Sequence, residues 1–294
     1  MTQIIPSLAT IAADYDAVFC DLWGCLHNGA RPFPAAVAAL QAFRAQGGRV
    51  ILLTNAPRPK VDVAAHLRAM GVTGDAFDDI VTSGEAAQFA MLSGAVGRQV
   101  HHIGAPKDEG FFRDFDPALT ALVASAGITR VPMKQAQGIV CTGLVDDMTE
   151  TPDHYRATLL MGKTLGLPML CANPDITVHV AGKLLYCAGA LAAEYEKMGG
   201  KTLYFGKPHP PIYDRARARL ADMGVDDPRI LCIGDGIATD VAGAAGEGLD
   251  CLYITSGVDG AQFGPNPAAP DSARLAAFLA ERQADPRYSM GFLG

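Results

Sequence analysis

The stretch Ala-Val-Phe-Cys-Asp-Leu-Trp-Gly-Cys-Leu, residues 17–26, decides how the rest of the chain is interpreted. Its first four residues are apolar, which predicts a strand that is buried on both faces of a parallel sheet. Asp21 follows this strand directly, and Gly24 then predicts a turn. Because ligands of open α/β sheets bind just beyond the carboxyl ends of the strands, Asp21 is a candidate nucleophile for phosphoryl transfer.

Length and composition favour a globular protein with two domains. The chain has 294 residues, more than the roughly 100–150 of a usual single domain. Hydrophobic residues make up 49% and charged residues 19%, which is typical of a chain with a large core. The 31 acidic residues exceed the 24 basic ones and give a formal charge of −7, which argues against a nucleic-acid-binding surface.

The sequence also predicts the cellular environment. No apolar run approaches the roughly 18 residues of a membrane span, and residues 1–10 lack the basic start and apolar stretch of a signal peptide. A cytoplasmic location without a membrane partner is therefore expected. The seven cysteines include no CxxC pair and predict reduced, buried thiols. Cys25 is interpreted as a small residue in a tight turn, because nothing nearby in sequence would activate its thiol.

Alternating helix and strand patterns predict an α/β fold. In the first part of the chain we expect strands at 17–20, 49–53 and 80–81 and helices at 34–46, 60–70 and 85–92. This order implies a parallel sheet with right-handed crossovers.

A second α/β domain is expected as an insertion over residues 88–180. Its expected elements are strands at 100–103, 138–141 and 169–171 and a helix at 154–165. Residues 1–87 and 181–294 then form the core. In its second part we expect helices at 187–198, 211–223 and 271–283, strands at 202–205, 230–233 and 251–254, and a tail at 285–294.

Four apolar runs each end in a polar residue able to act on a phosphate: Asp21, Thr54, Lys207 and Asp235. One parallel sheet would bring all four strand ends to the same edge. A carboxylate such as Asp21 can displace an alcohol from a phosphomonoester to form an aspartyl-phosphate. Lys207 and a Mg²⁺ ion held by Asp21 and Asp235 would balance the charge of the phosphate, and Thr54 can donate its hydroxyl to a phosphoryl oxygen.

At these residues the chain resembles the haloacid dehalogenase superfamily. The four motifs are matched by Asp21-Leu22-Trp23-Gly24, by Thr54-Asn55, by Lys207, and by Gly234-Asp235 with Asp240. The narrower class IIA branch, which contains nitrophenylphosphatase-like and sugar-phosphatase-like proteins, is resembled at Thr82-Ser83-Gly84, Ala172-Asn173-Pro174-Asp175 and Gly206-Lys207-Pro208. The resemblance implies a Rossmann-like, doubly wound parallel-sheet core with an inserted α/β cap domain, and Mg²⁺-dependent phosphatase activity.

The resemblance also implies roles for further residues. The backbone carbonyl of Trp23 is expected to bind the metal, and Asp240 to support the metal ligands or to cap the next helix. Asn55 is expected to bind phosphate. Asn173 and Asp175 either face the substrate or form a turn, since Asn-Pro-Asp is a strong turn sequence. Arg58 and His27 are each a candidate for contact with a substrate anion or for the missing proton carrier, and the alternative for each is a solvated loop side chain.

One position departs from the family pattern. Phosphatases of the family carry an aspartate two residues after the nucleophile as general acid and base, and here that residue is Trp23. Indole exchanges no proton at neutral pH, so this role is vacant or filled elsewhere. The first hypothesis is a phosphatase for a small phosphorylated metabolite that is slow or restricted to good leaving groups. The alternatives are a non-catalytic phosphometabolite binder and a hydrolase of carbon–halogen or carbon–phosphorus bonds. The oligomeric state stays open, and an exposed face of the cap is a candidate surface for a homodimer.

Overall fold

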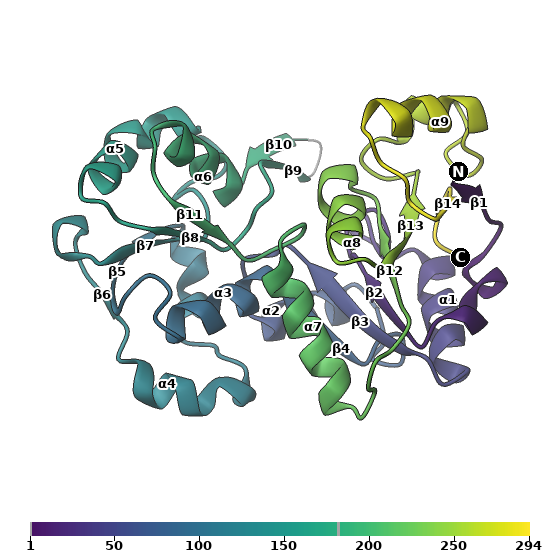
Figure 1. Cartoon of the computed structure of the whole chain (residues 1–294), viewed down its shortest axis with the longest axis horizontal. Coiled ribbons are helices and arrows are strands. Elements are labelled where there is room, and N and C mark those ends of the chain that lie inside the picture. Colours follow the sequence, from purple (N-terminus) through teal and green to yellow (C-terminus); the bar gives the residue numbers. More distant parts are fainter. Residues whose placement is uncertain (1, 181–182) are drawn as a thin grey trace. The chain divides into compact units, whose positions relative to one another are not determined.

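The computed structural model describes residues 2–180 and 183–294, which divide into two compact units. The first unit contains the chain up to Thr54, together with Ala64–Val81 and Lys207–Gly294. The second unit contains Asn55–Val63 and Thr82–Gly206. The colours of Figure 1 follow the chain through both units.

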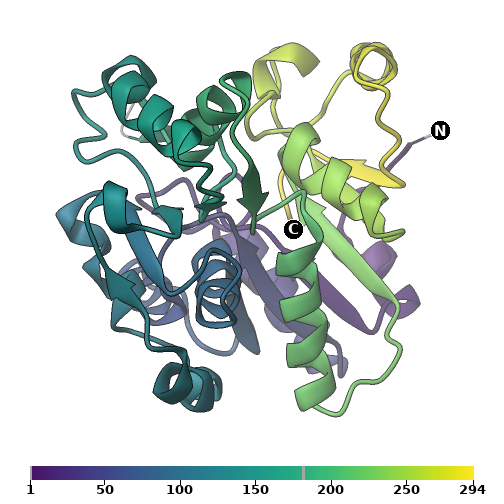
Figure 2. The same cartoon turned by 60° about the vertical axis from the view of Figure 1, so that its left-hand side comes forward.

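The first unit is built on a seven-stranded sheet. Its order is β1 (Gln3–Ile4), β14 (Tyr288–Met290), β13 (Asp250–Ile254), β12 (Ile230–Gly234), β2 (Ala17–Cys20), β3 (Arg49–Thr54) and β4 (Asp79–Thr82). Strand β2 lies between β12 and β3 and is parallel to both, with Ala17 opposite Ile230 and Arg49 (Figures 1 and 2). All four residues of β2 are buried, as the apolar run predicts. The predicted parallel α/β core is confirmed.

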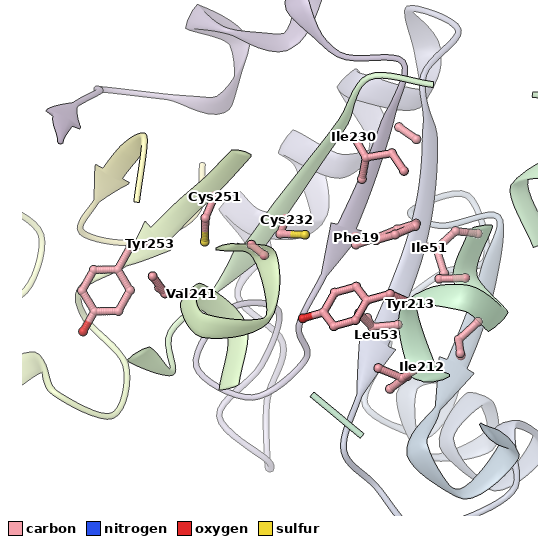
Figure 3. Packing of buried hydrophobic residues seen from close by; sticks show 14 of the residues in the cluster. Phe19, Ile51, Leu53, Ile212, Tyr213, Ile230, Cys232, Val241, Cys251 and Tyr253 are labelled. Carbon is pink, nitrogen blue, oxygen red and sulfur yellow. The ribbon is translucent and has the colours of Figure 1, made fainter. Parts of the chain in front are cut away.

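Helices cover this sheet. They are α1 (Pro34–Ala45), α7 (Pro210–Asp222), α8 (Ala242–Gly246) and α9 (Ser272–Glu281), while α2 (Lys60–Ala69) begins in the second unit and ends in the first. Figure 3 shows Phe19, Ile51 and Leu53 of the sheet packed beside Ile212 and Tyr213 of α7. Helix α7 thereby buries the strands that lead to the candidate site.

The second unit has its own parallel sheet of five strands. Its order is β11 (Thr202–Tyr204), β8 (Met169–Cys171), β7 (Gly138–Cys141), β5 (Gln99–Ile103) and β6 (Thr129–Arg130), and β9 (Thr177–Val180) pairs separately with β10 (Lys183–Tyr186). Its helices are α3 (Ser83–Leu92), α4 (Thr120–Ala126), α5 (Arg156–Thr164) and α6 (Ala188–Lys197). Val140 packs into one apolar cluster, while Ile139 and Cys141 pack into another, as expected for a strand covered on both faces.

The second unit is larger than the predicted insertion over residues 88–180. Residues 183–206 belong to it and not to the core, because β11 pairs in parallel with β8 and the chain crosses to the first unit only at Lys207. Helix α3 belongs to it as well, although residues up to 87 were expected in the core. The second predicted boundary adjoins Ala181 and Gly182, which lie outside the described residues.

The expected tail also has structure. Residues 288–290 form β14, which joins the sheet between β1 and β13. Strands β1 and β14 have only two and three residues, which is too short for a recognisable strand pattern in the sequence. They form because they pair with each other, although they lie at opposite ends of the chain. Helix α9 begins at Ser272, one residue inside the expected range, because the Asp271 carboxylate caps it by accepting hydrogen bonds from the backbone N–H groups of Ala273 and Arg274.

Replacing Phe19 by alanine tests the packing beneath α7. The ring is 1% exposed, so Phe19→Ala should leave a cavity and lower the free energy of unfolding by about 3–5 kcal/mol. Urea denaturation followed by circular dichroism measures this loss. Phe19→Leu is the control and should cost less, because it refills most of the volume. Equal stability of the alanine variant and the wild type would contradict the proposed packing.

Candidate active site

Asp21 and Asp235 follow two neighbouring strands at the same edge of the first unit's sheet. Asp21 comes directly after β2 and Asp235 directly after β12, where Cys20 lies opposite Ile233. The backbone N–H of Asp21 donates to the carbonyl of Ile233 over 2.8 Å, which continues the strand pairing up to the carboxylates. Both residues are buried, with 9% and 5% exposure. The sequence pattern therefore placed both acids at strand ends correctly.

Lys207 joins two of the buried acids. Its Nζ lies 2.6 Å from Oδ1 of Asp21 and 2.7 Å from Oδ1 of Asp240, and all three side chains are buried. The expectation that Lys207 ends a strand of the same sheet is wrong, since the preceding strand β11 belongs to the second unit. Lys207 instead approaches Asp21 from the segment that leads into α7. Thr54, 4% exposed, ends β3 beside β2, as predicted.

Asp240 lies in the helical turn Ile237–Val241. Its Oδ2 accepts a hydrogen bond from the backbone N–H of Gly236 over 3.1 Å, while its Oδ1 binds Lys207. The alternative role as N-cap of the next helix is wrong, because α8 begins at Ala242 and Val241 precedes it. Asp240 thus positions the lysine.

The site carries more negative than positive charge. Three buried carboxylates, those of Asp21, Asp235 and Asp240, face one ammonium in the described residues. Burial raises the pKa of Asp21 to about 7, although the Lys207 ammonium opposes the rise. Burial also raises the pKa of Asp235 well above its ordinary value, and the neighbouring Asp21 adds to the effect. A divalent cation would remove this repulsion.

The donor atoms fit such a cation. Within the described residues, a carboxylate oxygen of Asp21, one of Asp235 and the sulfur of Cys25 all lie within 4.8 Å of one another. Two carboxylates on neighbouring strand ends supply the hard oxygen ligands that Mg²⁺ takes. The role of the Trp23 carbonyl as a further ligand stays a prediction.

Two glycines that the sequence analysis did not single out as functional hold Asp235 in place. A Cβ on Gly24 would lie 2.0 Å from Oδ2 of Asp235, and one on Gly257 would lie 1.9 Å from the same atom. Gly24 also has φ of +72°, a conformation that favours glycine. The backbone N–H of Val258 donates to Oδ2 of Asp235 over 2.9 Å. Gly24, three residues after Asp21, was an available signal, whereas Gly257 follows β13 and nothing local in the sequence linked it to Asp235.

Trp23 lies on a support made by its own loop. The indole packs edge-on against His27, with ring centres 5.4 Å apart, and a Cβ on Gly29 would collide with it. His27 is 2% exposed, and its Nδ1 accepts a hydrogen bond from the backbone N–H of Gly29 over 3.0 Å. Burial lowers the pKa of His27 to about 4, so the ring is neutral at pH 7. This geometry favours a supporting role for His27.

The remaining candidates lie in the second unit. Nδ2 of Asn55 donates to Oδ1 of Asp175 over 2.8 Å, and the backbone N–H of Asp175 donates to Oδ1 of Asn173 over 3.0 Å. Asn173 and Asp175 therefore form the turn that their sequence favours, and Asn55 contacts it. Arg58 is exposed, and its carbonyl accepts a hydrogen bond from Oγ1 of Thr82. Substrate contacts of these four residues stay predictions.

Replacing Lys207 tests how much its ion pairs with the buried Asp21 and Asp240 stabilise the fold. We expect Lys207→Met to lower the free energy of unfolding by about 3–5 kcal/mol in the presence of a chelator, because two buried carboxyl groups lose their partner. In Lys207→Met/Asp240→Asn, part of this loss should be recovered. Urea denaturation gives all the values.

The exposed pair of Lys197 and Glu194 provides the control. Its Nζ–Oε1 distance is also 2.6 Å, but the lysine is 70% exposed, so Lys197→Met should cost less than about 1 kcal/mol. Equal losses for the two lysine variants would contradict the role of burial.

Comparison with known proteins identifies the family. Residues 18–117 match the family described as haloacid dehalogenase-like hydrolase, and residues 204–277 match a related hydrolase pattern of that family. A haloacid dehalogenase-like hydrolase from Brucella suis has a crystal structure with 41% identity and a TM-score of 0.82, covering 99% of this chain and 100% of its own.

A second relative is D-glycerol 3-phosphate phosphatase of Mycobacterium tuberculosis, 30% identical over 86% of this chain and 67% of its own. A structure of glycerol phosphate phosphatase from that organism in complex with magnesium has 29% identity and a TM-score of 0.63, covering 85% of this chain and 70% of its own. That metal agrees with the predicted Mg²⁺ cofactor. In the described residues, no helix has the length and apolar character needed to cross a bilayer.

These matches in sequence and structure show that the chain belongs to the haloacid dehalogenase-like hydrolase family.

Proposed function

We propose that this hydrolase is a Mg²⁺-dependent phosphatase for a small phosphorylated metabolite, with Asp21 as the nucleophile. The observation that carries the proposal is the buried contact of Lys207 with Asp21, directly beside the Asp235 carboxylate. The names of the Mycobacterium tuberculosis relatives, which are phosphatases of glycerol phosphate, support this substrate class.

The reaction follows from the chemistry of these side chains. A carboxylate oxygen of Asp21 attacks phosphorus, the bond from phosphorus to the ester oxygen breaks, and an aspartyl-phosphate forms. The leaving group departs as its oxyanion. Water then attacks the same phosphorus, the bond from phosphorus to the Asp21 oxygen breaks, inorganic phosphate leaves and the carboxylate is restored. The proton lost by the water passes through solvent to the oxyanion. Lys207 holds Asp21 through Oδ1 and offsets negative charge, and Thr54 donates its hydroxyl to a phosphoryl oxygen. Bound Mg²⁺ would supply further positive charge next to the phosphate.

Trp23 sets the choice of leaving group in this proposal. Its indole N–H does not give up its proton at neutral pH, so esters with acidic leaving groups, such as aryl or acyl phosphates, react best. The indole is 37% exposed while its ring contacts His27. Its exposed part is available as a wall of the substrate cavity, where it would contact the leaving group.

Asp21→Asn tests the nucleophile. We expect the loss of Mg²⁺-dependent hydrolysis of nitrophenyl phosphate, because an amide oxygen is a poor nucleophile for phosphorus. Asp16→Asn is the matched control, since Asp16 precedes β2, is exposed and pairs with Arg229. Activity that survives in Asp21→Asn would overturn the mechanism.

Trp23→Asp tests the missing acid. An aspartate here would protonate the leaving group, so we expect the rate for an alkyl phosphate to rise by about 10²-fold or more, with a smaller gain for nitrophenyl phosphate. Trp23→Phe is the control for lost packing and should give no such dependence on the leaving group. Equal changes for both esters in the Trp23→Asp variant would contradict this role.

Two alternative functions, a non-catalytic binder and a hydrolase of other bonds, predict different results in hydrolysis assays. A phosphometabolite binder that lost turnover, a hypothesis that Trp23 motivates, would show no Asp21-dependent hydrolysis of any ester in a screen of phosphate esters. A hydrolase of carbon–halogen or carbon–phosphorus bonds would release halide from an organohalide or phosphate from a phosphonate, and would not hydrolyse phosphate esters. The cytoplasmic location and the homodimer remain part of the proposal for this protein.

A further inference from the structure

The thiol of Cys25 lies in the cluster that contains the two metal-binding carboxylates. Its sulfur, an oxygen of Asp21 and an oxygen of Asp235 lie within 4.8 Å of one another. Two donors of one zinc ion are at most about 4.6 Å apart, because each bond is about 2.0–2.3 Å long. Small movements of the three side chains toward one another would therefore let them share one ion.

The backbone fixes the position of Cys25. The N–H groups of Leu26 and His27 both donate to the carbonyl of Leu22, over 2.8 and 3.0 Å, and the N–H of Gly24 donates to the carbonyl of His27 over 3.0 Å. These hydrogen bonds close a tight turn with Cys25 inside it, and the residue is 0% exposed. The sulfur thus stays beside Asp235 without a change in the loop.

The thiol of Cys25 has no hydrogen-bond partner among residues 2–180 and 183–294. The neighbouring Cys20 differs, because its thiol donates to the carbonyl of Asp21 over 3.1 Å. Cys20 is equally buried and is closer in sequence to Asp21, but its sulfur is not part of the three-atom cluster. An unpartnered sulfur at this place is a potential ligand.

We infer that Cys25 gives the metal site a sulfur ligand for thiophilic divalent cations such as Zn²⁺, Co²⁺ and Cd²⁺. The inference rests on the metal site of the proposed function and concerns which cations it accepts. Mg²⁺ takes oxygen ligands and leaves the thiol uncoordinated, whereas zinc and cobalt bind thiolate well. On binding, the S–H bond breaks, the sulfur–metal bond forms and the proton leaves to solvent. A thiophilic cation therefore competes with Mg²⁺ for Asp21 and Asp235.

Cobalt provides the direct test, because a cobalt–thiolate bond gives a charge-transfer absorption in the near ultraviolet. The full chain, stripped of metal with a chelator, is titrated with Co²⁺. The absorption is expected in the wild type and in Cys20→Ser and should be absent in Cys25→Ser. Zn²⁺ affinity, measured by calorimetry, should fall by at least about tenfold in Cys25→Ser, since even groups that only orient ligands contribute about 10- to 100-fold. Mg²⁺ affinity should stay unchanged.

The outcomes separate this inference from the proposed function. If Co²⁺ binds without the absorption while Mg²⁺ binding and Asp21-dependent hydrolysis persist, the inference fails and the phosphatase stands. If neither Mg²⁺ nor Co²⁺ binds, the metal site and the inference both fail. Should Cys25→Ser not fold, X-ray absorption of the Zn²⁺-loaded wild type decides: one sulfur neighbour supports the inference, and oxygen and nitrogen neighbours alone overturn it.

Discussion

The burial of three carboxylates beside one ammonium is the constraint on which the candidate site depends. Lys207 binds Asp21 and Asp240 directly, whereas Asp235 has only the backbone N–H of Val258 as a hydrogen-bond donor among the described residues. Such a cluster repels itself and is costly to bury without further positive charge. The same imbalance that makes the site costly in the free chain attracts a divalent cation and, with it, a phosphate ester.

The fold supports this cluster through rigid parts. Asp21 and Asp235 extend from neighbouring parallel strands, and the core beneath them, with Phe19 against α7, is closely packed. Gly24 and Gly257 bring the backbone to within contact of Asp235, where any side chain would collide. Position and charge are thus set before any ligand binds, which is the condition for electrostatic stabilisation of a reacting phosphate.

The loop after β2 combines two unusual residues with this ordinary framework. Trp23 stands where the resemblance predicts an acid, and Cys25 brings a sulfur to the carboxylates. Neither side chain takes part in the ion pairs of Lys207 with Asp21 and Asp240. In our proposals the framework therefore determines that phosphoryl transfer occurs, while the loop determines which leaving groups and which cations the site accepts.

The sequence alone determined that Asp21, Thr54 and Asp235 follow buried strands of a parallel α/β core, because apolar runs and turn residues are local signals. It did not show which sheet each strand joins. The pairing of β11 with β8, the return of Lys207 to Asp21 and the place of β14 depend on partners far away in the chain. The approach of the Cys25 sulfur to Asp235 was likewise decided only by tertiary structure, because the pairing of β2 with β12 brings Asp235 beside the local turn that holds Cys25.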